Sequence, residues 1–367
     1  MNGASLFQGR LVDTARRLAA GDPARDDDAL DALRQRIWAH WMLGHDGAAF
    51  DGYAHLAAIE HTHDPSYRGL WRGEQRTSEL GTMTPLTVHA TGAGHGDLIQ
   101  WSRWLPLLPS APVRGLVPAP LLRLFTRSFP AITWRAASGS APTVVDDATD
   151  RNDAPWIDLL RLPFTLRRGL ADAAPPYLRV DPAEVDAWRA HLDALFPTRR
   201  PRVGLAWTGA LAGASQDERS VPMASLAPLL RRHAATADFV SLLHGARTGD
   251  LEAAGVADIV LDVGDKLGDF AHAGALLEAV DLLVACDTAL VHLAGALARP
   301  TLLLLRREAF EGWWLGADAR GRRTGWYPSL RLLRQRREGD WSDVVARVDR
   351  MLRPLVTLAT ANAGRRA

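Results

Sequence analysis

The segment spanning residues 280–305 constrains the fold more than any other part of the chain. It contains two apolar runs of strand length, residues 282–285 and 301–305. Between them lie a polar corner, Asp287-Thr288, and a stretch of helix-forming composition at 289–297. Continuous apolar runs are typical of strands buried on both faces of a parallel sheet. The segment therefore predicts a strand, a helix capped by one of the two polar residues, and a second parallel strand.

The polar corner is also a candidate ligand site. A helix that starts at the carboxyl end of a parallel strand presents backbone N–H groups, and such positions bind phosphates in α/β sheets. A purely structural cap is the other use of an Asp-Thr pair, and this segment alone does not decide between them.

Composition narrows the class of protein. The net charge of +1 gives no overall field that would attract nucleic acid or an anionic membrane. The single cysteine, Cys286, allows no internal disulfide and no thiolate metal cluster, which fits a reducing compartment. Residues 1–8 lack the pattern of a signal peptide, and no apolar run approaches the ~18 residues that span a bilayer. We expect a cytoplasmic protein without a nucleic-acid partner or an integral membrane segment.

Three regions differ in their sequence pattern. Residues 1–80 are predicted to be helical, and Gly44 between two helical stretches suits a helix hairpin of the tetratricopeptide kind, a small cap or interaction surface. Residues 81–182 and 183–367 are each predicted to alternate strands and helices as α/β domains. The proline-rich stretch 174–182 is expected to be extended and to link them.

Several elements are expected within these two domains. Strands are predicted at 83–90, 113–117, 131–134 and 202–207, and helices at 98–108, 119–126, 223–233 and about 341–358. Residues 153–163 are predicted to form a short capped helix that ends at Pro163. Ser220 can cap the helix at 223–233.

The first predicted strand runs into a glycine-rich turn, residues 91–97. Glycines at 92, 94 and 96 let the backbone approach a ligand closely, because no Cβ intervenes. Asp97 falls in the first turn of the following helix, where an acid gains roughly 0.3–1 kcal/mol from the helix dipole. The glycine spacing is not that of the dinucleotide-binding fingerprint. The turn alone is therefore weak support for a ligand site.

Several motifs together resemble a known family. The blocks at 94–108, 202–207, 219–222, 287–296 and 326–335 occur in the same order as in bacterial tetratricopeptide-linked glycosyltransferases, which are related to the lipopolysaccharide heptosyltransferases of family 9. The resemblance covers roughly residues 40–355. It implies a GT-B architecture, in which two Rossmann-like domains face each other across a cleft and the C-terminal one holds most of the nucleotide-sugar. Whether the last helix crosses back to the other domain is left open.

The resemblance also implies an inverting transfer with no bound metal and no cofactor. Asp97 matches the family's catalytic aspartate, and Arg219 matches its basic residue at the diphosphate. The positions that match nucleotide-sugar-binding residues are Gly94, His95, Gly96, Thr208, His244, Asp287, Thr288, Ala289 and His292. His95 departs from the aliphatic residue that is usual there, so a phosphate contact and a solvated loop position both stay open. His292 can equally be a packed core histidine.

We therefore expect a glycosyltransferase that moves a sugar from a nucleotide-diphosphate donor to a protein or glycan acceptor. One alternative is a catalytically degenerate protein that binds a nucleotide-sugar, or serves as a scaffold, and recruits a partner through its helical N-terminal segment. Another is an epimerase or hydrolase of nucleotide-sugars. The sequence does not name the sugar, the base, the acceptor or the oligomeric state, because single side chains in variable loops make those contacts.

Overall fold

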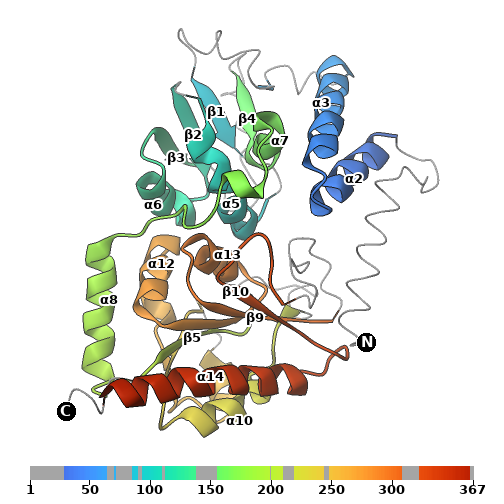
Figure 1. Cartoon of the computed structure of the whole chain (residues 1–367). Helices are drawn as coiled ribbons and strands as arrows, with labels where there is room; N and C mark the ends of the chain where they lie inside the picture. The colour runs from blue at the N-terminus through green and yellow to red at the C-terminus, as the bar shows by residue number, and fades with distance from the viewer. Residues whose placement is uncertain are drawn as a thin grey trace. The chain divides into compact units, whose positions relative to one another are not determined.

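Figure 1 shows a computed structural model of the chain. It describes residues 29–63, 70–71, 85–89, 93–109, 112–137, 155–198, 200–209, 219–243, 248–307 and 322–363. These residues fall into two compact units: a first unit that ends at Tyr177 and a second unit that begins at Leu178. The domain limits expected from the sequence, 81–182 and 183–367, stay a prediction.

The first unit contains, among its described residues, a four-stranded parallel sheet. The strands are β1 (Leu86–His89), β2 (Val113–Val117), β3 (Ile132–Ala136) and β4 (Trp156–Asp158), and their order is β3-β2-β1-β4. The helices that follow the strands are α5 (His95–Trp101), α6 (Ala119–Ser128) and α7 (Leu162–Leu166), with short 3-10 helices η3 (Ser102–Leu107), η5 (Leu159–Arg161) and η6 (Leu170–Asp172). The strand–helix alternation predicted at 113–134 is confirmed.

Two helices precede this sheet in the chain. They are α2 (Ala29–Met42) and α3 (Asp46–His63). Gly44 lies in the turn between them with a φ of 74°, a left-handed conformation that glycine adopts without steric cost. The rest of the predicted helical segment 1–80 lies outside the described residues, apart from Leu70 and Trp71. The backbone N–H of Trp71 donates to the Trp156 carbonyl at 2.7 Å, so this short piece extends the sheet beside β4.

The prediction of a helix at 153–163 was wrong. Trp156–Asp158 is strand β4, which pairs with β1, and α7 begins only at Leu162. Pro163 lies in the first turn of α7, where backbone N–H groups make no hydrogen bond within the helix. A proline, which has no N–H, is therefore tolerated there, and Pro163 starts a helix instead of ending one. The helix predicted at 98–108 is also shorter, because α5 ends at Trp101 and continues as η3, which contains Pro106.

The second unit contains a six-stranded parallel sheet, counted over the residues that the structure describes. Its order is β10-β9-β8-β5-β6-β7, with β5 (Arg202–Ala206), β6 (Asp238–Ser241), β7 (Val260–Asp262), β8 (Leu282–Cys286), β9 (Thr301–Leu305) and β10 (Leu330–Arg334). The helices are α8 (Pro182–Leu195), α10 (Met223–His233), α11 (Thr248–Ala253), α12 (Phe270–Ala279), α13 (Ala289–Ala296) and α14 (Ser342–Ala363), with the 3-10 helix η7 (Gly264–Lys266).

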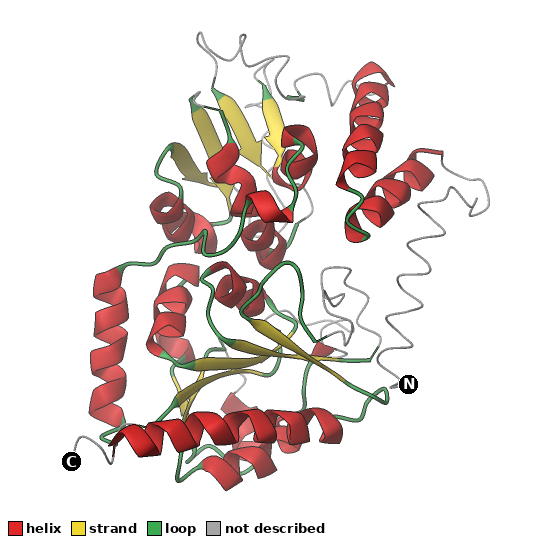
Figure 2. Ribbon diagram, viewed as in Figure 1, coloured by secondary structure: helices red, strands yellow, loops and turns green. Residues whose placement is uncertain are grey.

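Helices cover both faces of this sheet, α12 and α13 on one face and α10 and α14 on the other (Figures 1 and 2). The strand–helix–strand unit predicted at 280–305 is confirmed as β8, α13 and β9. Every residue of β9 is buried, as expected for a strand covered from both sides. Helix α8 and edge strand β10 were not predicted.

Candidate functional site

A candidate ligand site lies at the carboxyl end of the sheet in the second unit. Strands β5 and β8 are parallel neighbours. Trp207 and Thr208 follow β5, and Asp287 and Thr288 follow β8. Because neighbouring strands lie about 4.8 Å apart, these residues come together at one edge of the sheet, as the sequence predicted for the polar corner.

Arg219 is held at the same edge. The N–H of Val221 donates to the Trp207 carbonyl at 2.8 Å, and the hydroxyls of Thr208 and Ser220 hydrogen-bond at 2.7 Å. These contacts fix the loop that carries Arg219, whose Nη1 lies 4.0 Å from Asp287 Oδ2. The Asp287 side chain is 7% exposed and that of Arg219 31%. The edge therefore presents a half-exposed guanidinium that is balanced by a buried carboxylate.

The start of α13 lacks the side-chain cap that we expected. Thr288 occupies the N-cap position, but its side chain accepts no capping hydrogen bond. In the described part of the chain its Oγ1 is buried and has no hydrogen-bond partner. The first N–H groups of a helix have no partner within the helix, and a buried hydroxyl costs free energy until it is paired. An anionic or hydroxyl-bearing ligand at this position would satisfy such groups.

Ser220 was predicted to cap α10, and that prediction was wrong. Pro222 is the N-cap residue, and no side chain makes a capping bond. Ser220 bonds Thr208 instead, which ties the loop before α10 to the end of β5. The residue that we assigned to a helix cap therefore belongs to the framework of the candidate site.

His292 packs inside the second unit. It is the fourth residue of α13, and its Nδ1 is 3.1 Å from the hydroxyl of Tyr327. The two rings meet edge to face with their centroids 5.8 Å apart. These contacts give His292 a structural role, and a ligand contact for it stays a prediction.

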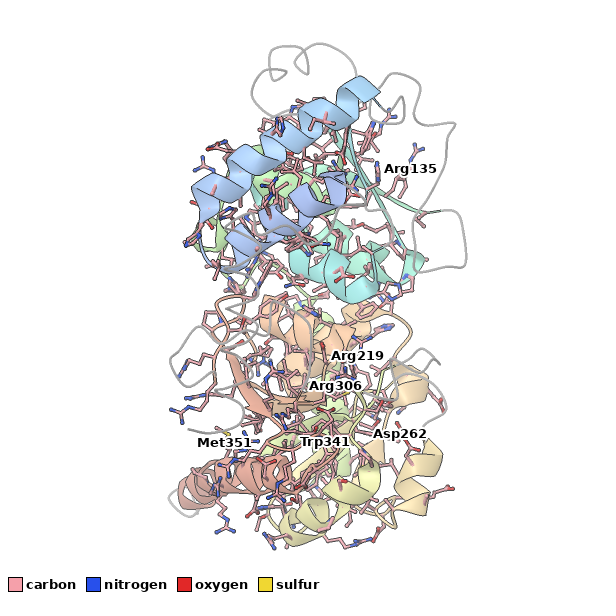
Figure 3. The ribbon with its side chains drawn as sticks, turned by 90° about the vertical axis from the view of Figure 1, so that its right-hand side faces the viewer. Arg135, Arg219, Asp262, Arg306, Trp341 and Met351 are labelled. Carbon is pink, nitrogen blue, oxygen red and sulfur yellow. The ribbon has the colours of Figure 1, made fainter. Side chains whose placement is uncertain are left out.

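Two arginines at the same edge were missed by the sequence analysis. Arg334 ends β10, Arg306 follows β9, and in the order of the sheet they continue the row that contains Asp287. Figure 3 shows Arg306 and Arg219 in the same part of the unit. Arg334 is buried and its Nη1 donates to the carbonyls of Arg306 and Arg307 at 3.3 and 3.4 Å. Burial lowers its pKa to about 10, with Asp287 among the acids that raise it, so Arg334 stays charged at neutral pH.

Arg219 and Arg334 thus give this edge positive charge around the buried carboxylate of Asp287. Cys286, directly before Asp287, is fully buried, and burial first and Asp287 second raise the pKa of its thiol while Arg219 lowers it. A thiol in this environment is not a nucleophile. The edge can bind an anion, but it does not offer thiolate chemistry.

A pocket of ≈ 330 Å³ adjoins the edge in the second unit. It is enclosed by the end of β5, the start of α10 and helix α11. Thr208 and Ser220 are among the residues that line it. Trp207, also in its wall, donates from Nε1 to Asp250 Oδ2 at 2.8 Å. The pocket offers a mixed apolar and polar lining next to the cationic edge.

The first unit carries a separate group of predicted site residues. Gly94, His95, Gly96 and Asp97 lie at the start of α5, with Gly94 as its N-cap. The N–H of Gly94 donates to Asp97 Oδ2 at 2.9 Å. Asp97 therefore caps its helix, and its role as a base stays a prediction. Burial lowers the pKa of the His95 imidazole, so His95 is neutral at physiological pH.

Some predicted features lie outside the described residues. These are His244 and positions 91–92 of the glycine-rich turn. In the parts of the chain that the structure describes, no three His, Cys, Asp or Glu side chains come together in an arrangement that could hold a metal ion. Metal independence stays a prediction. Among the described helices, none combines the length and the apolar composition needed to cross a bilayer.

Comparison with known proteins gives similarity at two levels. The chain matches no protein-family model. It is 28% identical to Protein FlbA of Caulobacter vibrioides over 284 residues, which are 72% of this chain and 45% of FlbA. The chain thus spans less than half the length of that relative.

Solved structures resemble the chain in fold. The ADP-heptose lipopolysaccharide heptosyltransferase II of E. coli aligns with a TM-score of 0.51 at 13% identity, covering 75% of this chain and 99% of that protein. A family 9 glycosyltransferase of Veillonella parvula aligns with a TM-score of 0.53 at 12% identity, covering 76% and 98%. The fold is GT-B-like. At these identities the similarity extends to the fold alone.

Proposed function

We propose that this protein is a glycosyltransferase that takes a sugar from a nucleotide-diphosphate donor. The observation that carries the proposal is the position of Arg219 beside Asp287 at the ends of β5 and β8. A half-exposed guanidinium and a helix start with a buried, unpaired hydroxyl offer the groups that a diphosphate needs. The GT-B-like fold supports the same conclusion.

In the proposed reaction Arg219 stabilises the leaving group. Negative charge builds up on the nucleoside diphosphate as its bond to the anomeric carbon breaks, and a guanidinium held in position lowers the energy of that state. Asp287 keeps Arg219 in place and is available, with Thr288 and Ala289, to meet the sugar and the diphosphate at the start of α13. Arg219 would thus supply the charge that a metal ion supplies in other transferases, and we propose a metal-independent reaction.

Asp97 is proposed as the general base. Its carboxylate would take the proton from an acceptor oxygen or nitrogen as that atom attacks the anomeric carbon, which inverts the configuration there. General base catalysis of this kind is typically worth about 10²–10⁴-fold. The bond from the Gly94 N–H to Oδ2 fixes the orientation of the carboxylate. The GT-B arrangement of two domains about a cleft, the protein or glycan acceptor and the cytoplasmic location belong to the same proposal.

A second candidate function is a nucleotide-sugar-binding protein without turnover. The bond between Gly94 and Asp97 favours it, because helix capping alone is a sufficient reason for an acid at this position. In that case the donor site would be retained and transfer would be absent.

The two candidates differ in the release of nucleotide. Purified protein is incubated with a panel of nucleotide-diphosphate sugars and a cell extract as the acceptor source, and free nucleoside diphosphate and labelled acceptor are measured. An ADP-linked heptose is the first donor to test, because a protein of similar fold is named for it. Transfer that needs both Asp97 and Arg219 and survives a chelator supports the enzyme. Donor binding without transfer supports the second candidate, and neither binding nor transfer refutes both.

A further inference from the structure

A cluster of aromatic rings joins the two N-terminal helices to the rest of the first unit. Phe164 of α7 lies at its centre, with ring centroids 4.9 Å from Trp41, 5.4 Å from Tyr53 and 6.1 Å from Trp38. Aromatic pairs at these separations stabilise packing beyond the area that they bury. Helices α2 and α3 are therefore packed into the first unit through a shared core.

The same cluster reaches α5, the helix that carries Asp97. Trp38 meets Trp101 edge-on with centroids 5.5 Å apart, and Trp41 lies 6.0 Å from Trp104. Trp101 and Trp104 are 1% and 0% exposed. Asp97 and Trp101 are four residues apart in α5 and so lie on the same face of the helix, one turn from each other. Trp38 thus contacts the last residue of α5, one helical turn after Asp97.

A buried ion pair adds a second connection. Glu60 of α3 is 3% exposed and accepts hydrogen bonds from Arg34 of α2 at 3.1 Å and from Arg161 at 2.5 Å. Arg161 belongs to η5, directly after β4, which is the neighbour of β1. A buried carboxylate is stable only with such partners. The pair between Glu60 and Arg161 therefore ties α3 to η5, at the end of β4.

We propose that α2 and α3 are a built-in support that positions α5, and that Trp38 is a positioning residue for Asp97. The catalytic part of this inference rests on the proposed function. It differs from a role of these helices in recruiting a partner, because their inner face is occupied by the unit itself. Trp38 acts through Trp101, and it does not touch the reacting atoms.

The test compares Trp38→Ala with Trp38→Phe and with a matched control, Trp134→Ala. Misplacing a reacting group by about 1 Å can cost roughly 10²-fold in rate, so we expect kcat per folded molecule to fall at least about tenfold in Trp38→Ala. Phenylalanine keeps an aromatic edge toward Trp101 and should restore most of the rate. Trp134 belongs to β3, at the opposite edge of the sheet from β4, and its ring centroid lies 5.1 Å from that of Phe125. Its removal should change kcat per folded molecule by less than about threefold.

Two further readouts separate positioning from a general loss of stability. Nucleotide affinity should be unchanged in all three variants, because the proposed donor residues belong to the second unit. Hydrogen–deuterium exchange should speed up at residues 95–101 in Trp38→Ala and not in Trp134→Ala. If Trp38→Ala is unfolded, Trp38→Leu replaces it in the same measurements.

The outcomes are distinct. Unchanged exchange in α5 together with an unchanged kcat in folded Trp38→Ala overturns the inference. A wild-type protein that transfers no sugar refutes the proposed function, while the exchange measurement still decides whether Trp38 holds α5. Faster exchange with a normal kcat overturns the link to Asp97 alone.

Discussion

Replacing Asp97 with asparagine separates the two roles that this residue can have. As a cap, Asp97 accepts the N–H of Gly94 at 2.9 Å through Oδ2. An asparagine side-chain oxygen accepts the same bond, so only the interaction of the charge with the helix dipole is lost, about 0.3–1 kcal/mol. As a base, Asp97 must take up a proton, which an amide cannot do. Turnover should then fall roughly 10²-fold or more, equivalent to about 2.7 kcal/mol of activation free energy.

The chain offers a matched control for this variant. Asp172 accepts the N–H of Gly169 through Oδ2 at 2.8 Å, the same local arrangement at the start of η6. Asp172→Asn should leave kcat unchanged. Its effect on the unfolding free energy combines the lost interaction with the helix dipole and the relief of repulsion between Asp172 and Asp46. The assay needs kcat, the nucleotide dissociation constant and thermal unfolding for each protein. Near-normal turnover in Asp97→Asn would refute the assignment of the base, and a parallel loss of nucleotide affinity would move Asp97 into the donor site.

Three other predictions concern the remaining groups. Arg219→Ala should weaken binding of a nucleoside diphosphate by roughly 10- to 100-fold in calorimetry, since hydrogen bonds to charged groups are worth about 1.5–3 kcal/mol, and an unchanged affinity would remove Arg219 from the donor site. Cys286 should not react with a thiol reagent at pH 8 until the protein unfolds, because burial raises the pKa of its thiol; rapid labelling of the folded protein would contradict its burial. Burial lowers the pKa of His95, so the unfolded chain binds more protons below about pH 6.5 and the unfolding free energy falls as the pH drops. His95→Gln should reduce the difference in unfolding free energy between pH 5 and pH 7, measured by denaturant unfolding. An equal difference in the wild type and the variant would contradict this prediction.

The strand–helix–strand unit β8–α13–β9 could be predicted because a strand covered on both faces has a continuous apolar sequence. Strand β4 could not. It has three residues, Trp156–Asp158, which show no periodicity, and its conformation is fixed by pairing with β1 and with Leu70. Pro163 added to the error, because a proline near a short apolar stretch can end a helix or start one.

The candidate site was only partly predictable for a related reason. Asp287 and Thr288 follow an obvious strand, so their position at the carboxyl edge could be expected. The orientation of the Thr288 hydroxyl could not, since a cap residue identifies a helix start but not the partner of its side chain. Arg306 and Arg334 were not predicted, because only the order of strands β8, β9 and β10, a tertiary property, brings the ends of β9 and β10 beside the end of β8.

We propose that the ends of β5 and β8 bind a nucleoside diphosphate, and calorimetric titration measures this binding without any acceptor. Nucleoside diphosphates of each base are titrated into the wild-type protein and into Arg219→Ala, with a chelator present. We expect saturable binding of at least one diphosphate to the wild type, with stabilisation of about 2.7 kcal/mol at a hundredfold excess over Kd, and a loss of affinity in the variant. No binding of any diphosphate at millimolar concentration, or equal binding to both proteins, would contradict it.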